Sequence, residues 1–138
     1  MPIIYILGMA DIVRSSVELG REYRMTERNI GVAPYQIPVK LKTLFDDVKF
    51  WMENHTFPNL EIAVRLHHRL VLIHPFPNGN GRISRLMADL LMQQLGEPRL
   101  YWGDASLNDI TDLRKKYIDA LHPADSGDYT ELIKFVTT

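Results

Sequence analysis

Apolar residues recur at steps of three and four along the middle of this 138-residue chain, and proline or glycine interrupts the pattern at short intervals. The pattern predicts helices at about residues 40–54, 60–73 and 82–95. Further apolar stripes, each preceded by residues that can cap a helix, predict two more helices at about residues 106–121 and 128–136. The fold is therefore expected to be mainly α, a bundle of helices joined by short loops.

The first forty residues have a different character, because Gly20, Gly31, Pro34 and Pro38 divide them into short β-prone pieces such as EYR and NIGV. We expect a small β-hairpin flap there, at about residues 20–38. The chain has no internal repeat and no low-complexity segment, and its length suits one globular unit with its own core. Residues 1–138 are thus expected to form a single domain.

The charge balance limits the classes of partner. The 16 basic and 17 acidic residues give a formal net charge of −1, so no overall field draws the chain to nucleic acid or to an anionic membrane surface. We expect small anions or proteins as partners, with no membrane and no direct nucleic-acid binding.

Cysteine is absent, which excludes disulfides, thiolate metal sites and a cysteine nucleophile, and fits a reducing cytoplasm. The opening MPIIYILGMA is apolar but has no basic segment, and it is far shorter than the roughly 20 residues that span a bilayer. A cytoplasmic location is therefore expected.

A polar loop, HPFPNGNGRISRL at residues 74–86, separates two of the predicted helices. The start of the second helix leaves backbone N–H groups unpaired and carries a partial positive charge, which stabilises an anion. Gly79 and Gly81 let the backbone approach a phosphate without interference from a Cβ, and the Asn80 amide can donate a further hydrogen bond. These three residues are expected to form an anion cradle.

Ionisable side chains stand on both sides of this cradle. Arg82 and Arg85 are three residues apart, so both project from the first turn of the helix, and each guanidinium can bind phosphate oxygens in bidentate fashion. His74 lies at the other end of the loop, and the imidazole pKa of about 6.5 suits a general base near neutral pH. A base beside a polyphosphate site indicates transfer of a phosphate-containing group to a hydroxyl.

Two other interpretations use the same loop. NGNG alone is a strong signal for a hairpin turn, but the predicted flanks are helical on both sides. The spacing of Gly79, Gly81 and Ser84 is similar to a dinucleotide-binding fingerprint, yet the third glycine is missing and a helix, not a strand, precedes it. Both interpretations are weaker than the anion cradle.

The histidines and one arginine also have structural alternatives. His67, His68 and His74 match no zinc motif, so His67 and His68 are interpreted as structural groups on a buried helix. Arg85 can pair with Asp89, four residues further along the same helix face. Such an ion pair can alternate with phosphate binding.

The segment HPFPNGNGRISR resembles the motif HPFx(D/E)GNGRxxR of the Fic/Doc enzymes and matches every fixed position but one. REYRMTERNIGVAPYQIPVKL resembles the family's flap, and LRKKYIDALHPADSGDYTELIKFV its closing helices. The chain looks most like a short bacterial group within the family, mobile mystery protein B. The resemblance implies a Fic-type helical bundle that transfers AMP from ATP to a Ser, Thr or Tyr hydroxyl of a target protein and releases pyrophosphate.

The resemblance also implies roles for particular residues. Carried over by position, His74 is the base that deprotonates the target hydroxyl, and Phe76 anchors the loop in the core. In the family the flap aligns the target backbone by strand addition, and Asn29, Ile30 and Gly31 fall at the flap here. The residues implied to bind the nucleotide phosphates are Gly79, Asn80, Gly81, Arg82 and Arg85.

Position 78 departs from the motif, because the family usually has Asp or Glu there to hold Mg²⁺ and this chain has Asn78. The Asn78 oxygen can ligate Mg²⁺ or Mn²⁺ but brings no charge, so weaker metal binding is expected, with the ATP phosphates supplying most of the attraction. Two alternatives stay open: the same fold with a different nucleotide donor or with removal of AMP, and a nucleotide-binding or toxin–antitoxin module whose catalysis is weakened.

Control of activity is a second departure. Many Fic enzymes are blocked by a helix bearing (S/T)xxxE(G/N), and none of the seven glutamates here has Ser or Thr four residues before it. The inhibitory helix either belongs to a separate antitoxin protein, lies upstream of residue 1, or is absent. We expect that this chain does not inhibit itself.

Overall fold

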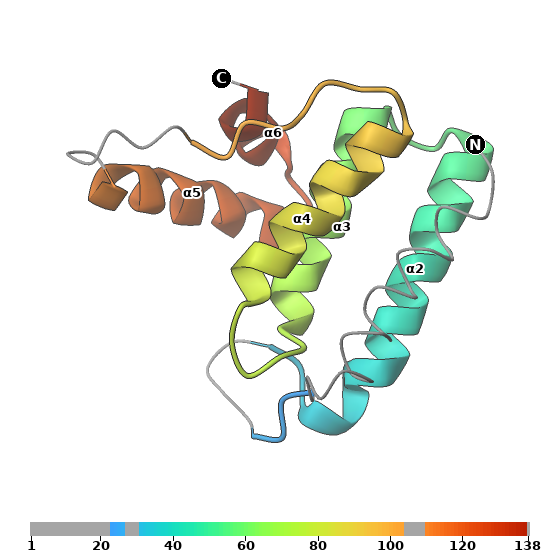
Figure 1. Cartoon of the computed structure of the whole chain (residues 1–138), viewed down its shortest axis with the longest axis vertical. Coiled ribbons are helices and arrows are strands. Elements are labelled where there is room, and N and C mark those ends of the chain that lie inside the picture. The colour runs from blue at the N-terminus through green and yellow to red at the C-terminus, as the bar shows by residue number, and fades with distance from the viewer. Residues whose placement is uncertain (1–22, 27–30, 104–109, 138) are drawn as a thin grey trace.

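The computed structural model describes residues 23–26, 31–103 and 110–137 of the chain, and helices make up most of them (Figure 1). No strand occurs within these described ranges. The mainly α fold is therefore confirmed. The elements are η1 (Pro34–Gln36), α2 (Ile37–Asn54), α3 (Asn59–Ile73), α4 (Asn80–Gln94), α5 (Ile110–Asp125) and α6 (Thr130–Thr137).

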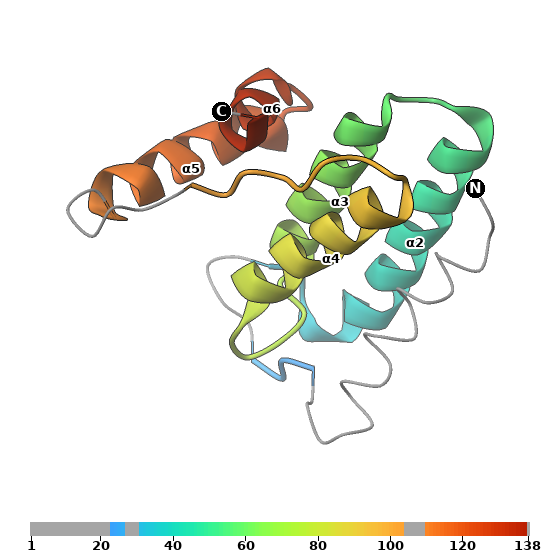
Figure 2. The same cartoon turned by 45° about the horizontal axis from the view of Figure 1, so that its top comes forward.

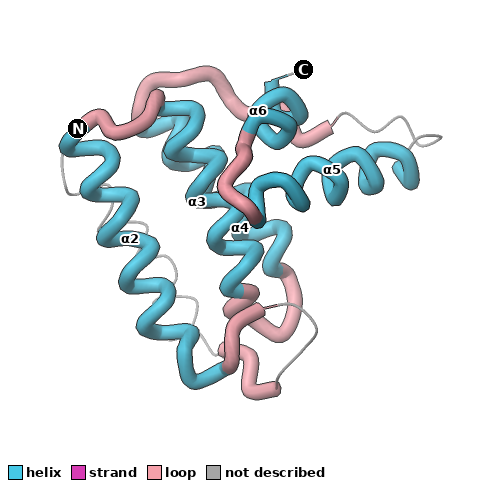
Figure 3. The backbone as a smooth tube through the Cα atoms, turned by 180° about the vertical axis from the view of Figure 1, so that it is seen from behind, coloured by secondary structure: helices cyan, strands magenta, loops and turns pink. Residues whose placement is uncertain are grey.

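The helices form two groups around α3. Helix α3 packs between α2 and α4, and these three helices run side by side (Figures 1 and 2). Helix α6 contacts both α3 and α5, and α5 lies across the other helices at one side of the molecule (Figure 3). The α3 residues that fill the centre of the core are Ile62, Ala63, Val64, Leu66, Leu70 and Ile73. Because α3 is covered on several sides, its apolar residues lie on more than one face, as its sequence predicts.

Prolines set the beginning of the first described helices. Pro34 occupies the first turn of η1 and Pro38 the first turn of α2, where the fixed φ of proline suits a helix and its missing N–H has no intrahelical partner to lose. The predicted flap boundary at residue 38 is thus wrong, since residues 34–38 are helical. Asn29 and Ile30 lie outside the described residues, so the hairpin itself stays a prediction.

The last two helices differ from their predicted bounds. Helix α5 continues through Pro123 to Asp125, past the predicted end at about residue 121. A proline in the last turn removes few backbone bonds, and here the N–H groups of Ser126 and Asp128 both donate to the Pro123 carbonyl at 3.0 Å. The predicted cap at Ser106 and Asp109 lies outside the described residues.

The start of α6 agrees with its predicted cap. The Asp128 carboxylate accepts a hydrogen bond from the Thr130 backbone N–H at 3.1 Å. Hydrogen bonds from Thr130 lower the pKa of the Asp128 carboxyl below its usual value. None of the described helices is both long and apolar enough to cross a membrane.

Candidate active site

The loop between α3 and α4 has a left-handed residue at each end. His74 closes α3 with φ 51° and ψ 61°, and Gly79 precedes α4 with φ 74°. Glycine adopts this conformation freely, but a residue with a Cβ does so at a cost of about 1–2 kcal/mol. The conformation of His74 therefore requires support from its surroundings.

Arg24 supplies that support from a segment far away in the sequence. It is 2% exposed, and its backbone N–H donates a hydrogen bond to the carbonyl of Pro75 at 2.8 Å. Two of the carbonyls that its guanidinium binds, those of Ile73 and His74, lie at the end of α3, where carbonyls lack helical partners and a positive charge is favourable. The guanidinium donates to the carbonyls of His74 (2.8 Å), Thr26 (2.7 Å), Ile73 (3.2 Å) and Val32.

Gly31 lies directly against this arrangement. Its φ is +97°, and a Cβ placed on it would stand 2.6 Å from an Nη of Arg24 and 2.8 Å from the Cβ of His74. Both contacts are shorter than side chains tolerate. Gly31 is one of the residues expected in the flap. Because it has no side chain, the segment that carries it can approach Arg24 and His74 closely.

Inside the loop, Asn80 holds the backbone of Phe76 from both sides. Its Oδ1 accepts from the Phe76 N–H at 2.9 Å, and its Nδ2 donates to the Phe76 carbonyl at 2.7 Å. Phe76 is fully buried, with its ring 5.8 Å from that of Tyr23, as expected for an anchor. The Asn80 amide, expected to contact phosphate, is engaged within the loop instead, so its backbone N–H is left as the anion donor.

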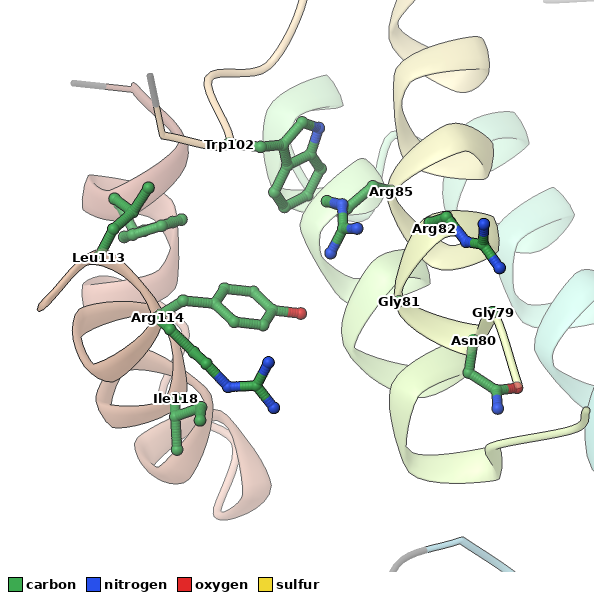
Figure 4. A pocket seen from close by; sticks show the side chains of 11 residues that line it. Gly79, Asn80, Gly81, Arg82, Arg85, Trp102, Leu113, Arg114 and Ile118 are labelled. Atoms are coloured by element: carbon green, nitrogen blue, oxygen red, sulfur yellow. The ribbon is translucent and has the colours of Figure 1, made fainter. Parts of the chain in front are cut away.

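A pocket of about 620 Å³ opens between the start of α4 and helix α5 (Figure 4). It brings together five of the residues predicted from the sequence with side chains of α5, α6 and the segment before α5. The lining residues are Gly79, Asn80, Gly81, Arg82, Arg85, Trp102, Leu113, Arg114, Tyr117, Ile118 and Phe135. This volume is typical of small-molecule sites.

Two cations face each other across this pocket. Arg85 points from α4 toward α5, and Arg114 points from α5 back toward α4 (Figure 4). Arg82 extends to the other side of α4. An Nη of Arg85 would lie 3.1 Å from a Cβ added at Gly81, so this guanidinium covers the start of α4. One end of the pocket thus combines guanidinium groups with the N-terminus of a helix.

The other predicted site residues lie outside this lining. His74 is half-buried at the opposite end of the loop, beside Arg24 and Gly31. Asn78 is exposed within the loop. The loop therefore separates the segment around His74 from the anion-binding end of the pocket.

His67, Trp102 and Tyr117 form the wall behind the pocket. The His67 Nε2 lies 2.6 Å from the Tyr117 hydroxyl, and its ring lies 4.5 Å from that of Trp102. Burial lowers the pKa of His67 to about 3, and the charge of Arg85 acts in the same direction. Burial also raises the pKa of Tyr117 to about 12. Both groups are therefore neutral near pH 7.

Asp89 holds the Trp102 side of this wall. The indole Nε1 of Trp102 donates to both carboxylate oxygens of Asp89, at 3.0 and 3.1 Å. The alternative pairing of Arg85 with Asp89 is not found among the ion pairs of the described residues; the cation nearest to Asp89 there is Arg99, at 3.9 Å. Arg85 remains directed at the pocket.

His68 has the structural role expected for it. It is 2% exposed, its Nδ1 lies 3.0 Å from the Tyr129 hydroxyl, and its Nε2 lies 2.8 Å from the carboxylate of Asp125. These contacts join α3 to the end of α5 and the start of α6. His68 thus connects helices rather than lining the pocket.

Comparison with known proteins identifies the family. Residues 9–92 match the family model described as Fic/DOC family. This chain belongs to the Fic/DOC family. The segment that resembles the family motif, residues 74–85, lies within the matched range and joins α3 to α4.

Related Fic proteins cover nearly all of the chain. It is 33% identical to the protein adenylyltransferase fic-1 of Caenorhabditis elegans over 95% of its length, and 29% identical to the protein adenylyltransferase Fic of Aedes aegypti over 95%. The chain spans only 24% of the length of each of these two relatives.

Solved Fic structures share the fold. A structure of Fic-1 from C. elegans superposes with a TM-score of 0.67 at 29% identity, covering 99% of this chain and 39% of that one. A Fic domain containing signaling protein from Bacteroides thetaiotaomicron gives a TM-score of 0.60 at 25% identity, covering 83% and 48%. The Fic-type fold is thus confirmed.

The Fic site of this chain offers a poor set of ligands for Mg²⁺. Asn78 replaces the carboxylate of the motif, and no Asp or Glu is among the described residues that line the pocket. The described ranges also contain no group of three His, Asp or Glu side chains that could hold a metal ion. Since Mg²⁺ sites normally use carboxylates, the donors present do not suit a tightly held magnesium ion.

Sequence reasoning missed two residues of this Fic site. Arg24 lies fifty positions before His74 in the sequence, and no local pattern links them. Arg114 looks like one of several charges on the solvent face of a helix, since Lys115 and Lys116 follow it. The only signal for Arg114 is its position three residues before Tyr117, on the face that turns out to line the pocket.

Proposed function

We propose that this chain transfers AMP from ATP to a hydroxyl group of a target protein and releases pyrophosphate. The observation that carries the proposal is the pocket itself, in which the loop of a Fic/DOC protein, the start of α4 and the guanidinium of Arg85 converge without a carboxylate among the described lining residues. Such a site suits a polyphosphate. The relatives named protein adenylyltransferase support AMP as the transferred group.

In the proposed reaction the target hydroxyl attacks the α-phosphorus of ATP. A bond forms between the hydroxyl oxygen and this phosphorus, the bond to the β-phosphate oxygen breaks, and pyrophosphate leaves. His74 accepts the hydroxyl proton. The backbone N–H groups at Asn80 and Gly81, with Arg82 and Arg85, bind the phosphates and stabilise their charge as the bond breaks.

The base and the phosphate site lie at opposite ends of one short loop, which suits a reaction between two bound partners. The target would dock on the side of His74 and Gly31, while ATP occupies the pocket. Docking of an extended target segment along the flap at Asn29, Ile30 and Gly31 stays part of the proposal. So do a cytoplasmic location, a bacterial origin and control by a separate antitoxin protein.

The proposal is tested with ATP labelled at the α-phosphate, incubated with the protein and a cell lysate. Label should appear on protein, and the His74→Ala variant should lose at least about 100-fold of the rate, the typical contribution of a general base. His122→Ala changes an exposed histidine far along α5 and is the matched control, with the rate unchanged. Labelling that survives His74→Ala would remove His74 from the reaction.

Repeating the experiment with other nucleotides labelled at the α-phosphate, together with a titration of the protein with ATP, separates the alternatives. Label delivered only from another nucleotide would change the donor and keep the chemistry. ATP binding without transfer from any donor would leave a binding module.

A further inference from the structure

Among the described residues, the charges around the pocket are unbalanced. Arg85 and Arg114 face each other from α4 and α5, whereas Arg82, which also lines the pocket, extends to the other side of α4 (Figure 4). No ion pair within residues 23–26, 31–103 and 110–137 joins any of these three guanidinium groups to a carboxylate. Like charges that face each other repel, and an anion between them removes the repulsion. The arrangement of Arg85 and Arg114 therefore favours a ligand of high negative charge.

Arg114 is the unexpected member of this set. It belongs to α5, outside the loop that carries the Fic motif, and its side chain reaches across the pocket toward the start of α4 (Figure 4). Its neighbours Lys115 and Lys116 are also exposed but do not line this pocket. The direction of Arg114, and not simply the basic character of the helix, brings a second cation into the pocket opposite Arg85.

In a nucleotide-binding site, a divalent metal ion normally supplies the positive charge that neutralises the phosphates. Mg²⁺ neutralises two charges of a nucleotide triphosphate and is held by a carboxylate together with the phosphates. Here the motif position for that carboxylate is Asn78, and the described lining contains no other. The described part of the site thus has no carboxylate at the motif position and has a guanidinium, that of Arg114, on the α5 wall of the pocket.

We propose that Arg114 binds the phosphates of ATP together with Arg85 and takes over part of the charge that a metal ion would supply, so that this chain binds ATP without a divalent metal. The inference rests on the proposed function only in taking ATP as the ligand of the pocket. It concerns binding, which is measured apart from AMP transfer.

The test is isothermal titration of the protein with ATP, once with EDTA and once with Mg²⁺. The wild-type chain should bind ATP in EDTA at least as tightly as in Mg²⁺, because ATP without metal keeps its full charge for Arg85 and Arg114. Arg114→Gln should raise the Kd in EDTA about tenfold or more, the effect of one hydrogen-bonded charge. Lys115→Gln removes the same charge from the next residue of α5 and should leave the Kd unchanged.

Two further variants sharpen the result. Arg114→Lys keeps the charge but not the planar fork, and should recover part of the affinity. Asn78→Asp should bind ATP more weakly in EDTA and more tightly in Mg²⁺, because the new carboxylate repels the phosphates and attracts the metal. Circular dichroism of each variant verifies that its helices are intact, and Arg114 is exposed, so folding should not change.

The outcomes are distinct. Equal Kd values in EDTA for Arg114→Gln and Lys115→Gln would overturn the proposal, and so would a wild-type chain that binds ATP only with Mg²⁺ or not at all. Metal-free binding that depends on Arg114 supports it, even if no protein is labelled in the transfer assay. In that case only the proposed transfer of AMP fails.

Discussion

The Nε of Arg24 donates a hydrogen bond to the backbone carbonyl of His74 at 2.8 Å, and this buried arginine thereby fixes the residue proposed as the base. The same guanidinium reaches Ile73, the last residue of α3. Because the two carbonyls end a helix, they have no helical partners, and the positive charge also favours that end of the helix. The position of His74 thus depends on a segment that enters from the N-terminal part of the chain.

Replacing Arg24 should therefore affect both stability and transfer. Arg24→Met leaves several buried carbonyls without donors, and we expect the free energy of unfolding to fall by about 3 kcal/mol, measured by urea denaturation. If Arg24 also positions His74, the variant that still folds should show a lower kcat for labelling while its Kd for ATP stays near the wild-type value.

The matched control is Arg99→Met, since the Arg99 side chain is 84% exposed and contacts Asp89 only at 3.9 Å. Its stability should change by less than about 0.5 kcal/mol. A parallel loss of ATP binding and transfer in Arg24→Met would mean that Arg24 is purely structural.

Gly31→Ala tests the close approach of this segment to His74. The new Cβ would enter the space of Arg24 and His74 at a left-handed φ of +97°, and we expect a loss of about 3 kcal/mol in unfolding free energy. Gly96→Ala is a stringent control, because Gly96 also has a positive φ, +73°, but nothing lies within 4 Å of its added Cβ. That variant should lose only about 1 kcal/mol. Equal losses would show that backbone strain alone, without the steric contact, accounts for the effect.

The helices of this fold follow from local patterns, because their apolar spacing and their proline and glycine stops are visible in a single sequence. Helix boundaries are harder to predict where proline is compatible with a helix end, as at Pro38 and Pro123. The residues that line the pocket at the start of α4 can also be found from the sequence, since Gly79 and Arg85 lie within seven residues of one another, whereas phosphate binding by them stays a prediction. Predictions for the flap at Asn29 and Ile30 remain untested.

The rest of the site depends on contacts between distant segments. The place of Trp102 in the pocket wall follows from its bond to Asp89, thirteen positions away. The Asn80 side chain was expected to bind phosphate, but its hydrogen bonds to Phe76 depend on how the loop closes. Neither fact has a local signature, because the acceptors are fixed only when the helices pack.

His67 should make the fold sensitive to acid. Its pKa is about 3 in the folded chain and about 6.5 when unfolded, so the unfolded state binds more protons between these values. The contribution of the buried neutral His67 to the free energy of unfolding is fully present above about pH 6.5 and is lost as the pH falls toward 3. Between about pH 7 and about pH 4.5 this group should lower the free energy of unfolding by roughly 2 kcal/mol.

The measurement compares urea denaturation of the wild type and of His67→Gln at the two pH values. Glutamine keeps a hydrogen-bonding group near Tyr117 but does not titrate, so the variant should be less stable at neutral pH and should lose less stability on acidification. An unchanged pH dependence would contradict the low pKa of His67.

Asp89 should set the shape of the pocket through Trp102. Its carboxylate accepts the indole N–H at 3.0 and 3.1 Å, and Asp89→Ala leaves that donor without its partner. A hydrogen bond to a charged group contributes about 1.5–3 kcal/mol, so the Trp102 side chain should lose its fixed position and the Kd for ATP should rise several-fold.

Fluorescence quenching by acrylamide reports the mobility of Trp102 directly if Trp51 is first replaced by Phe, since the chain contains two tryptophans. Asp89→Asn retains an acceptor and should lie between wild type and Asp89→Ala in both measurements. Unaltered quenching in Asp89→Ala would show that packing against His67, and not the carboxylate, holds the indole in place.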